Sequence, residues 1–470
     1  MLKKPLIVFY LLLLHTALTA QITLEQTIEL AKRNSYAAQL SGNENKLAAL
    51  NYTAFKLAGK PSLFFYGNAP VYNKDNYAVT QPDGSIKFLP RSQNYSNVGI
   101  GFSQPINFTG GTLAINTDLY RFDNFVTKTK QYNGTPFFLR LTQPLFKYNA
   151  YTWDKLIVPL KLQEAALTQK ADILQIEYDV CKLYFDIAEA QSNEQLAISN
   201  LQNSNANLTI EKRRAQLGVS TEDKVLQLEM QQINSQQQQR AAQLTIQQAF
   251  LALHTFINSA DTANRQLEIP EQLPAISIDK EKIIAVAKKN LPQYLSFQRK
   301  KLEAQSKTDE AQKQGRQIDL VASYGLNNAA TNLSAIYRNP QDQQRFSIGF
   351  AIPVADWGKR KNNMAVAKLQ EEQVEINNKQ EEAKLISEII NLVNELPVLK
   401  NNATQSLLLD TLSQKRFSIT NRLFQSGKVS LLELQAAQAE KDNARRNYIA
   451  ALRRFWESYY LLKVKIGTDF

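Results

Sequence analysis

The stretch Arg-Arg-Ala-Gln-Leu-Gly-Val-Ser at residues 213–220 returns late in the chain as Asn-Arg-Leu-Phe-Gln-Ser-Gly-Lys-Val-Ser at residues 421–430. Gly218 in the first copy corresponds to Gly427 in the second, 209 residues further on. Long heptad-bearing segments precede both glycines and shorter apolar-periodic segments follow them, so each stretch is predicted to be the turn of a helical hairpin. A motif that repeats over such a distance indicates a chain built from two copies of one structural unit.

A second pair of motifs repeats with the same spacing. Residues 140–146 read Arg-Leu-Thr-Gln-Pro-Leu-Phe, residues 347–354 read Ser-Ile-Gly-Phe-Ala-Ile-Pro-Val, and Pro353 follows Pro144 by 209 residues. Each half therefore has the same order of predicted elements: a short helix, an alternating segment, a very long helix, a glycine turn and a second helix. The predicted organisation is a signal peptide at 1–20, repeat 1 at 21–260, a proline-bearing linker at 261–278 and repeat 2 at 279–470.

Heptad spacing marks the long helices. Leu369, Ile376, Ala383 and Ile390 recur every seven residues, which predicts a coiled-coil seam. Pro397 falls deep inside the same segment and predicts a bend or a local break. At about 1.5 Å per residue, each long helix reaches on the order of 100 Å. The predicted helices cover 22–58, 151–217, 220–258, 279–315, 357–426 and 429–466.

Between the helices, apolar residues alternate with polar or small ones, as in Phe346, Ile348 and Phe350. A soluble sandwich alternates in the same way, but the export signal, the aromatic-rich segment ends and the small number of strands favour tilted membrane strands of about ten residues each. The first such region is the longer of the two, so either its outer loop is enlarged or an extra hairpin turns at Thr109-Gly110-Gly111; clean alternation on both sides favours the hairpin. The strands are expected within 61–150 and 317–355, and the outer loops at 68–93, 123–135 and 327–343.

Composition narrows the class of protein. Lys3 and Lys4, followed by an apolar run and small residues, are typical of a secretory signal peptide. A single cysteine excludes a disulfide framework, and His254, the one histidine after that segment, argues against a histidine-based metal cage or catalytic base. The chain shows no phosphate-binding glycine loop, nucleophile elbow or metal-ligand cluster, so we expect no enzyme, no cofactor and no metal. The net charge of +12 is spread along helices, which argues against nucleic acid as a partner.

The strands are too few to close a barrel from one chain. Open sheet edges do not occur in lipid, because unpaired backbone groups there cost several kcal/mol each. If the strands lie in a membrane, the chain must therefore associate with further copies, and the barrel is shared between them.

These residues resemble the TolC family of outer membrane efflux proteins. The resemblance rests on the leading helix with Leu24, Ala31 and Asn34, on the strand ends Gln-Pro-Leu-Phe (143–146) and Ile-Pro-Val-Ala-Asp-Trp-Gly-Lys-Arg (352–360), and on the paired glycine turns. It implies a mixed α/β membrane protein built from two internal repeats: a homotrimer with one shared β-barrel in outer membrane lipid and a long antiparallel coiled-coil α-helical tunnel in the periplasm. Structural residues at the barrel exit would be Pro144, Pro353 and Gly358.

The resemblance also implies a functional tip at the two glycine turns, where a periplasmic adaptor protein docks. Glu433 matches a position that is often acidic in the family and rings the constriction, and Asp223 is followed by Lys224 at a position often acidic. The alternative for Glu433 is a solvated carboxylate on the helix surface with no role in gating. The alternative for Asp223 is a favourable interaction with the helix dipole in the first turn, again without gating. The candidate tip residues are Gly218, Asp223, Lys224, Gly427, Lys428 and Glu433.

The function that follows from the resemblance is passive conduction. The chain would be the exit duct of a tripartite efflux or type I secretion system, through which an inner-membrane pump of the RND or ABC class and its adaptor drive substrates out of the cell. One alternative is a trimeric coiled-coil surface stalk or adhesin, which would not need strand pairs in mid-chain or two glycine turns. Another is an autonomous porin, which would not place most of its chain in long helices.

Overall fold

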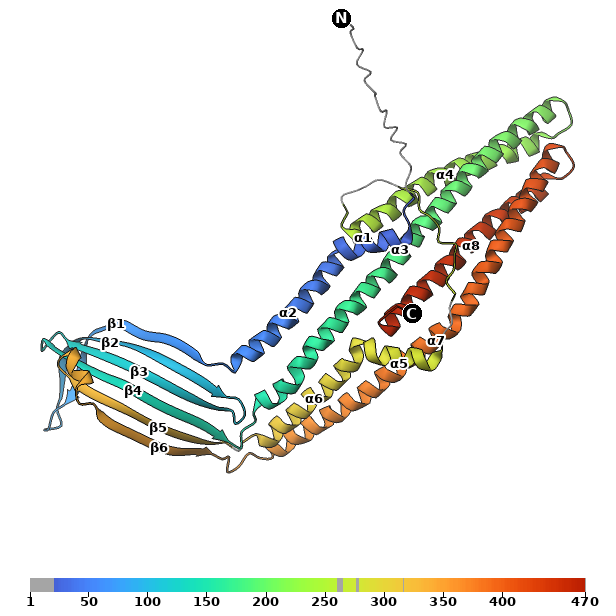
Figure 1. Ribbon diagram of the computed structural model, residues 1–470. Helices are drawn as coiled ribbons and strands as arrows, with labels where there is room; N and C mark the ends of the chain where they lie inside the picture. The colour runs from blue at the N-terminus through green and yellow to red at the C-terminus, as the bar shows by residue number, and fades with distance from the viewer. Residues whose placement is uncertain (1–20, 260–264, 276–278, 316, 470) are drawn as a thin grey trace, which may run out of the picture. The chain divides into compact units, whose positions relative to one another are not determined.

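The computed structural model describes residues 21–259, 265–275, 279–315 and 317–469. The predicted signal peptide at 1–20 lies outside these ranges, as does part of the predicted linker at 261–278. Eight α-helices, one 3₁₀ helix and six strands are present in the described part of the chain (Figure 1). No helix in the described part is both long enough and apolar enough to span a membrane.

The two halves of the chain contain long helices of matching length. α3 and α7 each have 67 residues, and α4 and α8 each have 36. All four begin and end within two residues of the predicted bounds. The helices are α1 (Leu24–Asn34), α2 (Tyr36–Ala58), α3 (Ala150–Gln216), α4 (Glu222–Ile257), α5 (Lys280–Asn290), α6 (Pro292–Lys313), η1 (Leu333–Tyr337), α7 (Lys359–Gln425) and α8 (Leu431–Ile466).

The chain divides into two compact units, and each takes segments from both halves. The first consists of the described residues of Met1–Asn45, Ala166–Tyr294 and Glu382–Phe470, and the second of Lys46–Ala165 and Leu295–Glu381. The predicted boundary between the repeats is thus a boundary in sequence and not between compact units. Such an arrangement follows when corresponding elements of the two halves pack against each other.

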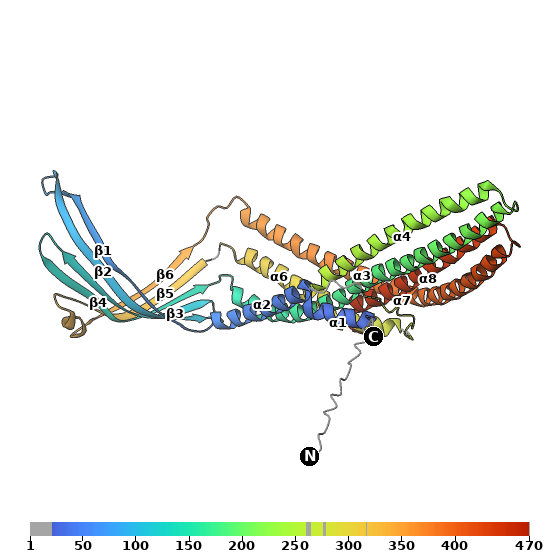
Figure 2. The same cartoon turned by 90° about the horizontal axis from the view of Figure 1, so that it is seen from above.

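The second unit contains a single antiparallel sheet in the order β1-β2-β3-β4-β5-β6 (Figure 1), and its strands are curved (Figure 2). Four strands precede α3 and two precede α7, so the longer first region carries an extra hairpin, with its turn at residues 107–110. The predicted loop at 68–93 is wrong, because β1 and β2 pair through most of it, and the predicted loop at 123–135 is also largely strand. The strands are β1 (Ser62–Thr80), β2 (Ile86–Ile106), β3 (Gly111–Asn124), β4 (Thr129–Leu145), β5 (Gln317–Ala330) and β6 (Gln341–Ala351).

The first unit is a helical body with one large apolar core. The described part of the linker crosses this body and is held by side chains from it. The Trp456 indole N–H donates to the carbonyl of Pro270 at 3.0 Å, and the Lys400 ammonium donates to the carbonyl of Pro274 at 2.8 Å. The large, fully buried side chains of the core include Tyr184, Tyr448, Phe185, Phe455 and Leu24.

Two of the predicted helices are interrupted. The segment at 22–58 breaks at Ser35, whose extended backbone ends α1 while its hydroxyl accepts from Ala38 N at 3.2 Å and caps α2. The segment at 279–315 breaks at Leu291, because the residue before a proline disfavours helical backbone angles and Pro292 then starts α6. Both breaks use ordinary capping chemistry that the apolar period does not record.

Two predictions for α7 also require correction. Of the bend or local break predicted at Pro397, the break is wrong, because the helix is uninterrupted there; burial of the neighbouring Leu396 and Val393 in the core stabilises the continuous helix. The predicted seam is wrong within a single chain, since Leu369 and Ile376 are 60% and 56% exposed. The buried apolar residues of α7 are instead Ala367, Ile389, Leu392, Val393, Leu396, Ala403, Phe417 and Phe424.

Candidate functional site

The two faces of the sheet differ in chemistry. Side chains two residues apart share a face, and directly opposite residues on paired strands share it too. One face carries large apolar side chains that are exposed, with Phe65 at 74%, Phe346 at 66% and Phe350 at 75%. A contiguous exposed apolar surface of this kind is typical of contact with lipid or with another protein. The exposed apolar residues of this face include Leu63, Phe65, Val98, Ile100, Tyr324, Phe346, Ile348 and Phe350.

The opposite face, which we call the polar face, is lined by small and polar residues. Aromatic rings from β1 lie flat across glycines of β2. A Cβ at Gly101 would come within 2.4 Å of the Phe64 ring, and one at Gly99 within 2.6 Å of the Tyr66 ring. The Tyr66 hydroxyl donates across β2 to Asp118 of β3.

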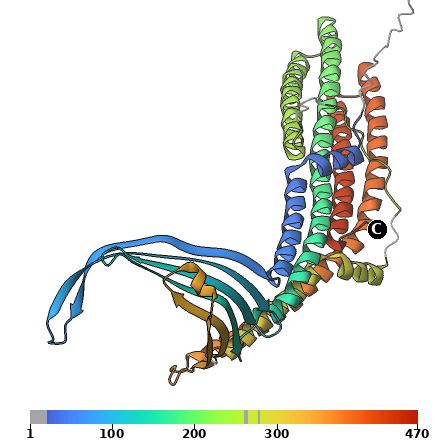
Figure 3. The same cartoon turned by 60° about the vertical axis from the view of Figure 1, so that its left-hand side comes forward.

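The glycines show how the sheet bends. On β4 and β5 the same arrangement recurs, since a Cβ at Gly325 would meet the Phe138 ring at 2.8 Å. Side chains crowd on the concave side of a curved sheet, and glycine relieves that crowding. We therefore assign the polar face to the concave side of the curved sheet seen in Figure 3.

The junction between sheet and helices contains the predicted barrel-exit residues. Pro144 lies at the inner end of β4, opposite Asp319 of β5. Pro353 lines a cleft of about 910 Å³ together with Trp357, which is 97% exposed. Gly358 has φ +84°, a left-handed conformation that suits glycine at the start of α7. The structure brings Pro353 close to the start of α7 and leaves Pro144 in the strand.

The two glycine turns have matching backbone geometry. Gly218 has φ +72° and Gly427 has φ +77°, the left-handed conformation of a helix C-cap. Val219 N donates to the Arg214 carbonyl and Lys428 N donates to the Leu423 carbonyl, each at 2.9 Å. These bonds satisfy carbonyls at the ends of α3 and α7 and reverse the chain into α4 and α8. The hairpin turns predicted from the repeated motif are therefore present at both positions.

The charged residues predicted at the turns are exposed. Asp223 lies in the first turn of α4, followed by Lys224, and Lys428 follows Gly427. Glu433 is the third residue of α8, where its carboxylate accepts from Ser430 N at 2.7 Å and from the Ser430 hydroxyl at 2.9 Å. These bonds, the backbone one first, hold the pKa of the Glu433 carboxyl below its ordinary value. Glu433 thus completes a capping box, a local role that the sequence analysis did not assign to it.

The sequence analysis missed the side chains that join the two turns. The Arg214 guanidinium donates to the carbonyls of Phe424 and Gln425 at 3.0 and 2.9 Å, and it pairs with the Glu211 carboxylate at 3.0 Å. Glu211 is only 4% exposed, and it also accepts from the Ser220 hydroxyl. Arg214 therefore holds the last carbonyls of α7 from the end of α3. Two adjacent arginines precede the first turn, and nothing in the sequence distinguishes the one that makes these contacts.

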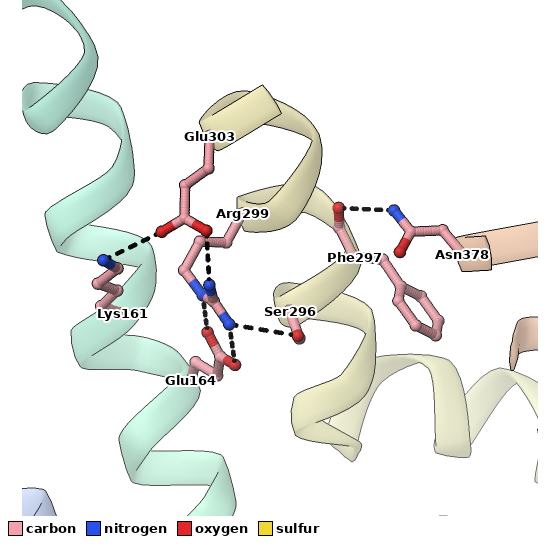
Figure 4. A network of polar contacts seen from close by, with 7 residues as sticks. All are labelled: Lys161, Glu164, Ser296, Phe297, Arg299, Glu303 and Asn378. Atoms are coloured by element: carbon pink, nitrogen blue, oxygen red, sulfur yellow. Dashed lines mark hydrogen bonds and ion pairs between the residues drawn. The ribbon is translucent and has the colours of Figure 1, made fainter. Parts of the chain in front are cut away.

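A second polar network joins helices from the two halves within the second unit (Figure 4). Arg299 of α6 binds both carboxylate oxygens of Glu164 of α3, at 2.5 and 3.0 Å, and also Glu303 at 2.9 Å. Lys161 of α3 approaches Glu303 at 3.0 Å. The Arg299 and Glu164 side chains are 18% and 19% exposed, so this two-pronged pair is largely shielded from water. Within the described ranges, no group of three or more His, Cys, Asp or Glu side chains is arranged to hold a metal ion.

Comparison with known proteins finds a family likeness in the second half of the chain. Residues 294–463 match a family model described as outer membrane efflux protein. These residues are similar to the outer membrane efflux protein family. The resemblance stated from the sequence is thereby confirmed, and the matched residues include β5, β6, α7 and most of α8. A comparison with curated proteins finds no match.

Solved structures extend the likeness, as a likeness of fold, to nearly the whole chain. The outer membrane channel CmeC of Campylobacter jejuni is 14% identical with a TM-score of 0.69, over 94% of this chain and 85% of its own. The outer membrane protein VceC of Vibrio cholerae is 13% identical with a TM-score of 0.67, over 95% and 96%. The open state of the MtrE outer membrane channel of Neisseria gonorrhoeae is 14% identical with a TM-score of 0.64, over 95% and 89%. The mixed α/β fold is therefore shared with outer membrane channels.

Proposed function

We propose that the protein is an outer membrane exit duct, a homotrimer that conducts substrates passively through one shared β-barrel. The observation that carries the proposal is the difference between the two faces of the sheet. Its convex face is apolar and exposed, its concave face is polar, and its outermost strands β1 and β6 are far apart in the sheet order. A sheet with these faces suits lipid outside and water inside.

Closure of the sheet supports the three-copy arrangement. Within the described part of the chain, no strand pairs with the outer edge of β1 or of β6. In lipid each unpaired backbone group on those edges would cost several kcal/mol. If β6 of one copy pairs with β1 of the next, three copies of six strands give eighteen. Closed barrels of about that size enclose an aqueous channel.

The helical hairpins supply the other half of the proposed duct. The helices would extend the channel into the periplasm, with the glycine turns at its tip. Apolar side chains at the turns are exposed, with Leu217 at 78%, Val219 at 73% and Leu432 at 75%. Exposed apolar residues on a rigid turn suit contact with a second protein, here a periplasmic adaptor that links the duct to an inner-membrane pump of the RND or ABC class. The transported substrate would be set by that pump.

Reconstitution in planar bilayers tests this function. The purified protein should form discrete channels, and the tip should restrict their conductance. The matched variants are Arg214→Ala, which removes the contact between the turns, and Arg213→Ala, which removes a neighbouring exposed arginine. We expect higher single-channel conductance from Arg214→Ala only. A surface stalk would form no channels, and an autonomous porin would conduct fully without any effect of the turns; either result would exclude the proposed function.

A further inference from the structure

Two arginines on the polar face of the sheet have no carboxylate partner among the residues that the structure describes. Arg140 lies on β4 and Arg345 on β6, and strand register places both directly beside Ser323 of β5. Both side chains are exposed. The Arg140 guanidinium lies 5.3 Å from the centre of the Phe138 ring, which places it on the same face as the glycine-supported aromatic rings. Two strand spacings separate the arginine backbones, roughly 10 Å.

The carboxylates of the sheet are engaged elsewhere. Asp75 is paired with Arg91 and Asp123 with Arg121, while Asp118 accepts from the Tyr66 hydroxyl. Of the other two, Asp319 accepts from Gln317 at 2.6 Å, and Asp342 lies on the opposite face. The six strands contain no other Asp or Glu.

Distance isolates the two arginines from the acids on their own face. Asp118 is four residues along β3 from Ala114, which is opposite Arg140, and Asp319 is four residues along β5 from Ser323. Four residues of strand span roughly 13 Å. At physiological ionic strength the screening length is about 8 Å, so these acids contribute little to the potential at the guanidinium groups.

We propose that Arg140 and Arg345 form an anion-binding belt on the concave face of the sheet. This inference rests on the proposed duct, in which three copies would place three such pairs around one aqueous lumen. Each guanidinium offers a planar set of N–H donors that fits the oxygens of a phosphate, carboxylate or sulfonate. The residues directly beside the pair, Ser323 and Ala114, carry no charge that would neutralise it.

The belt predicts which solutes the membrane part of the duct favours. Rings of arginine or lysine in a pore concentrate anions and exclude cations. Solutes that carry phosphate, carboxylate or sulfonate groups would therefore be retained briefly at this level before they leave.

The test uses tripolyphosphate as the probe in planar bilayers. Added on the barrel side, it should block the wild-type current, and the half-blocking concentration should rise by about tenfold or more in the double variant Arg140→Gln/Arg345→Gln. The double lysine variant at the same positions keeps the charge and should retain most of the block. Arg91→Gln is the control, because that sheet arginine already has a carboxylate partner. An unchanged half-blocking concentration in the double glutamine variant would overturn the belt.

Calorimetry separates failure of the belt from failure of the duct. Tripolyphosphate binding is measured on the detergent-solubilised protein, where no pore is needed, with the wild type and the same three variants. Channels that show neither block nor binding would leave the duct standing and refute the belt. Binding that depends on Arg140 and Arg345 in a protein that forms no channels would support the belt and refute the proposed conduction.

Discussion

At the residue scale, Glu433 has two candidate roles, one in an acidic ring at the tip and one in the capping box of α8. The sequence resemblance places it in an acidic ring, and the structure places its carboxylate on the backbone N–H and hydroxyl of Ser430. Glutamine can form the same capping box but has no charge. The two roles therefore respond differently to two substitutions at a single position.

We expect Glu433→Ala to change single-channel conductance and Glu433→Gln to leave it close to wild type, because only alanine removes the side-chain bond from residue 433 to the Ser430 backbone N–H, one half of the capping box of α8. Glu372→Ala, on an exposed position of α7, is the control. Since the folded-state pKa of Glu433 is lowered, the cap's contribution is present above the ordinary glutamate pKa of about 4.3 and is lost as pH falls through the folded value. Glutamine and alanine variants with the same altered conductance would show that the charge itself acts at the tip.

Arg214 is the residue for which we expect the largest effect on the tip. Its removal frees two carbonyls of α7 and leaves the buried Glu211 without its cation, at a cost of about 2–4 kcal/mol of local stability. Arg214→Ala should make residues 213–220 and 421–430 sensitive to proteinase K. Glu211→Gln in the same background should restore part of the resistance, because no charge is then left buried. Equal protection in Arg214→Ala and wild type would show that the contact contributes nothing.

At the scale of elements, the sequence predicted the long helices well and their contacts poorly. Heptad spacing in α7 identifies an apolar stripe but not the surface that covers it, which is why Leu369 and Ile376 are exposed in the single chain. The break at Ser35 depends on one hydroxyl cap, and the continuity across Pro397 depends on packing around Leu396. Such features depend on single hydrogen bonds and on tertiary contacts, and the spacing of apolar residues in the sequence predicts neither.

The glycine turn of the second hairpin gives a direct test at this scale. Gly427→Val should strain a backbone held at φ +77°, since a β-branched residue disfavours the left-handed region. We expect reduced export with a normal amount of protein in the outer membrane, measured by efflux assay and immunoblot. Gly427→Asn is the matched control, because asparagine tolerates this conformation. Full efflux in Gly427→Val cells would show that the conformation of this turn is not needed for export.

The curved sheet gives a second test. A side chain at Gly101 would collide with the Phe64 ring at 2.4 Å, so Gly101→Val should prevent the ring from lying across β2. We expect loss of the assembled, heat-resistant oligomer on gel electrophoresis. Gly349→Val on β6 is the control, because the nearest atom to a Cβ there is 3.8 Å away. Normal assembly of Gly101→Val would contradict the assignment of the polar face to the concave side.

At the scale of the whole molecule, the repeat in sequence and the compact units in structure do not coincide. Helices from both halves contribute to each unit. Within the second unit, the bidentate contact of Arg299 with Glu164 joins a helix of the second half to a helix of the first. The number of strands in the first half was left open by the sequence, because alternation alone does not separate a long loop from a second hairpin. The arginine pair on the polar face could not be found from sequence, since only strand register brings Arg140 and Arg345 to one neighbour.

The central claim is that one chain supplies six strands to a barrel shared by several copies. Native mass spectrometry of the mature protein, released from detergent micelles, measures this most directly. The account predicts a mass of three copies, stable over the concentration range used, because both edge strands are then paired. A stable monomer that keeps its strand content by circular dichroism would contradict the shared barrel and the duct built on it.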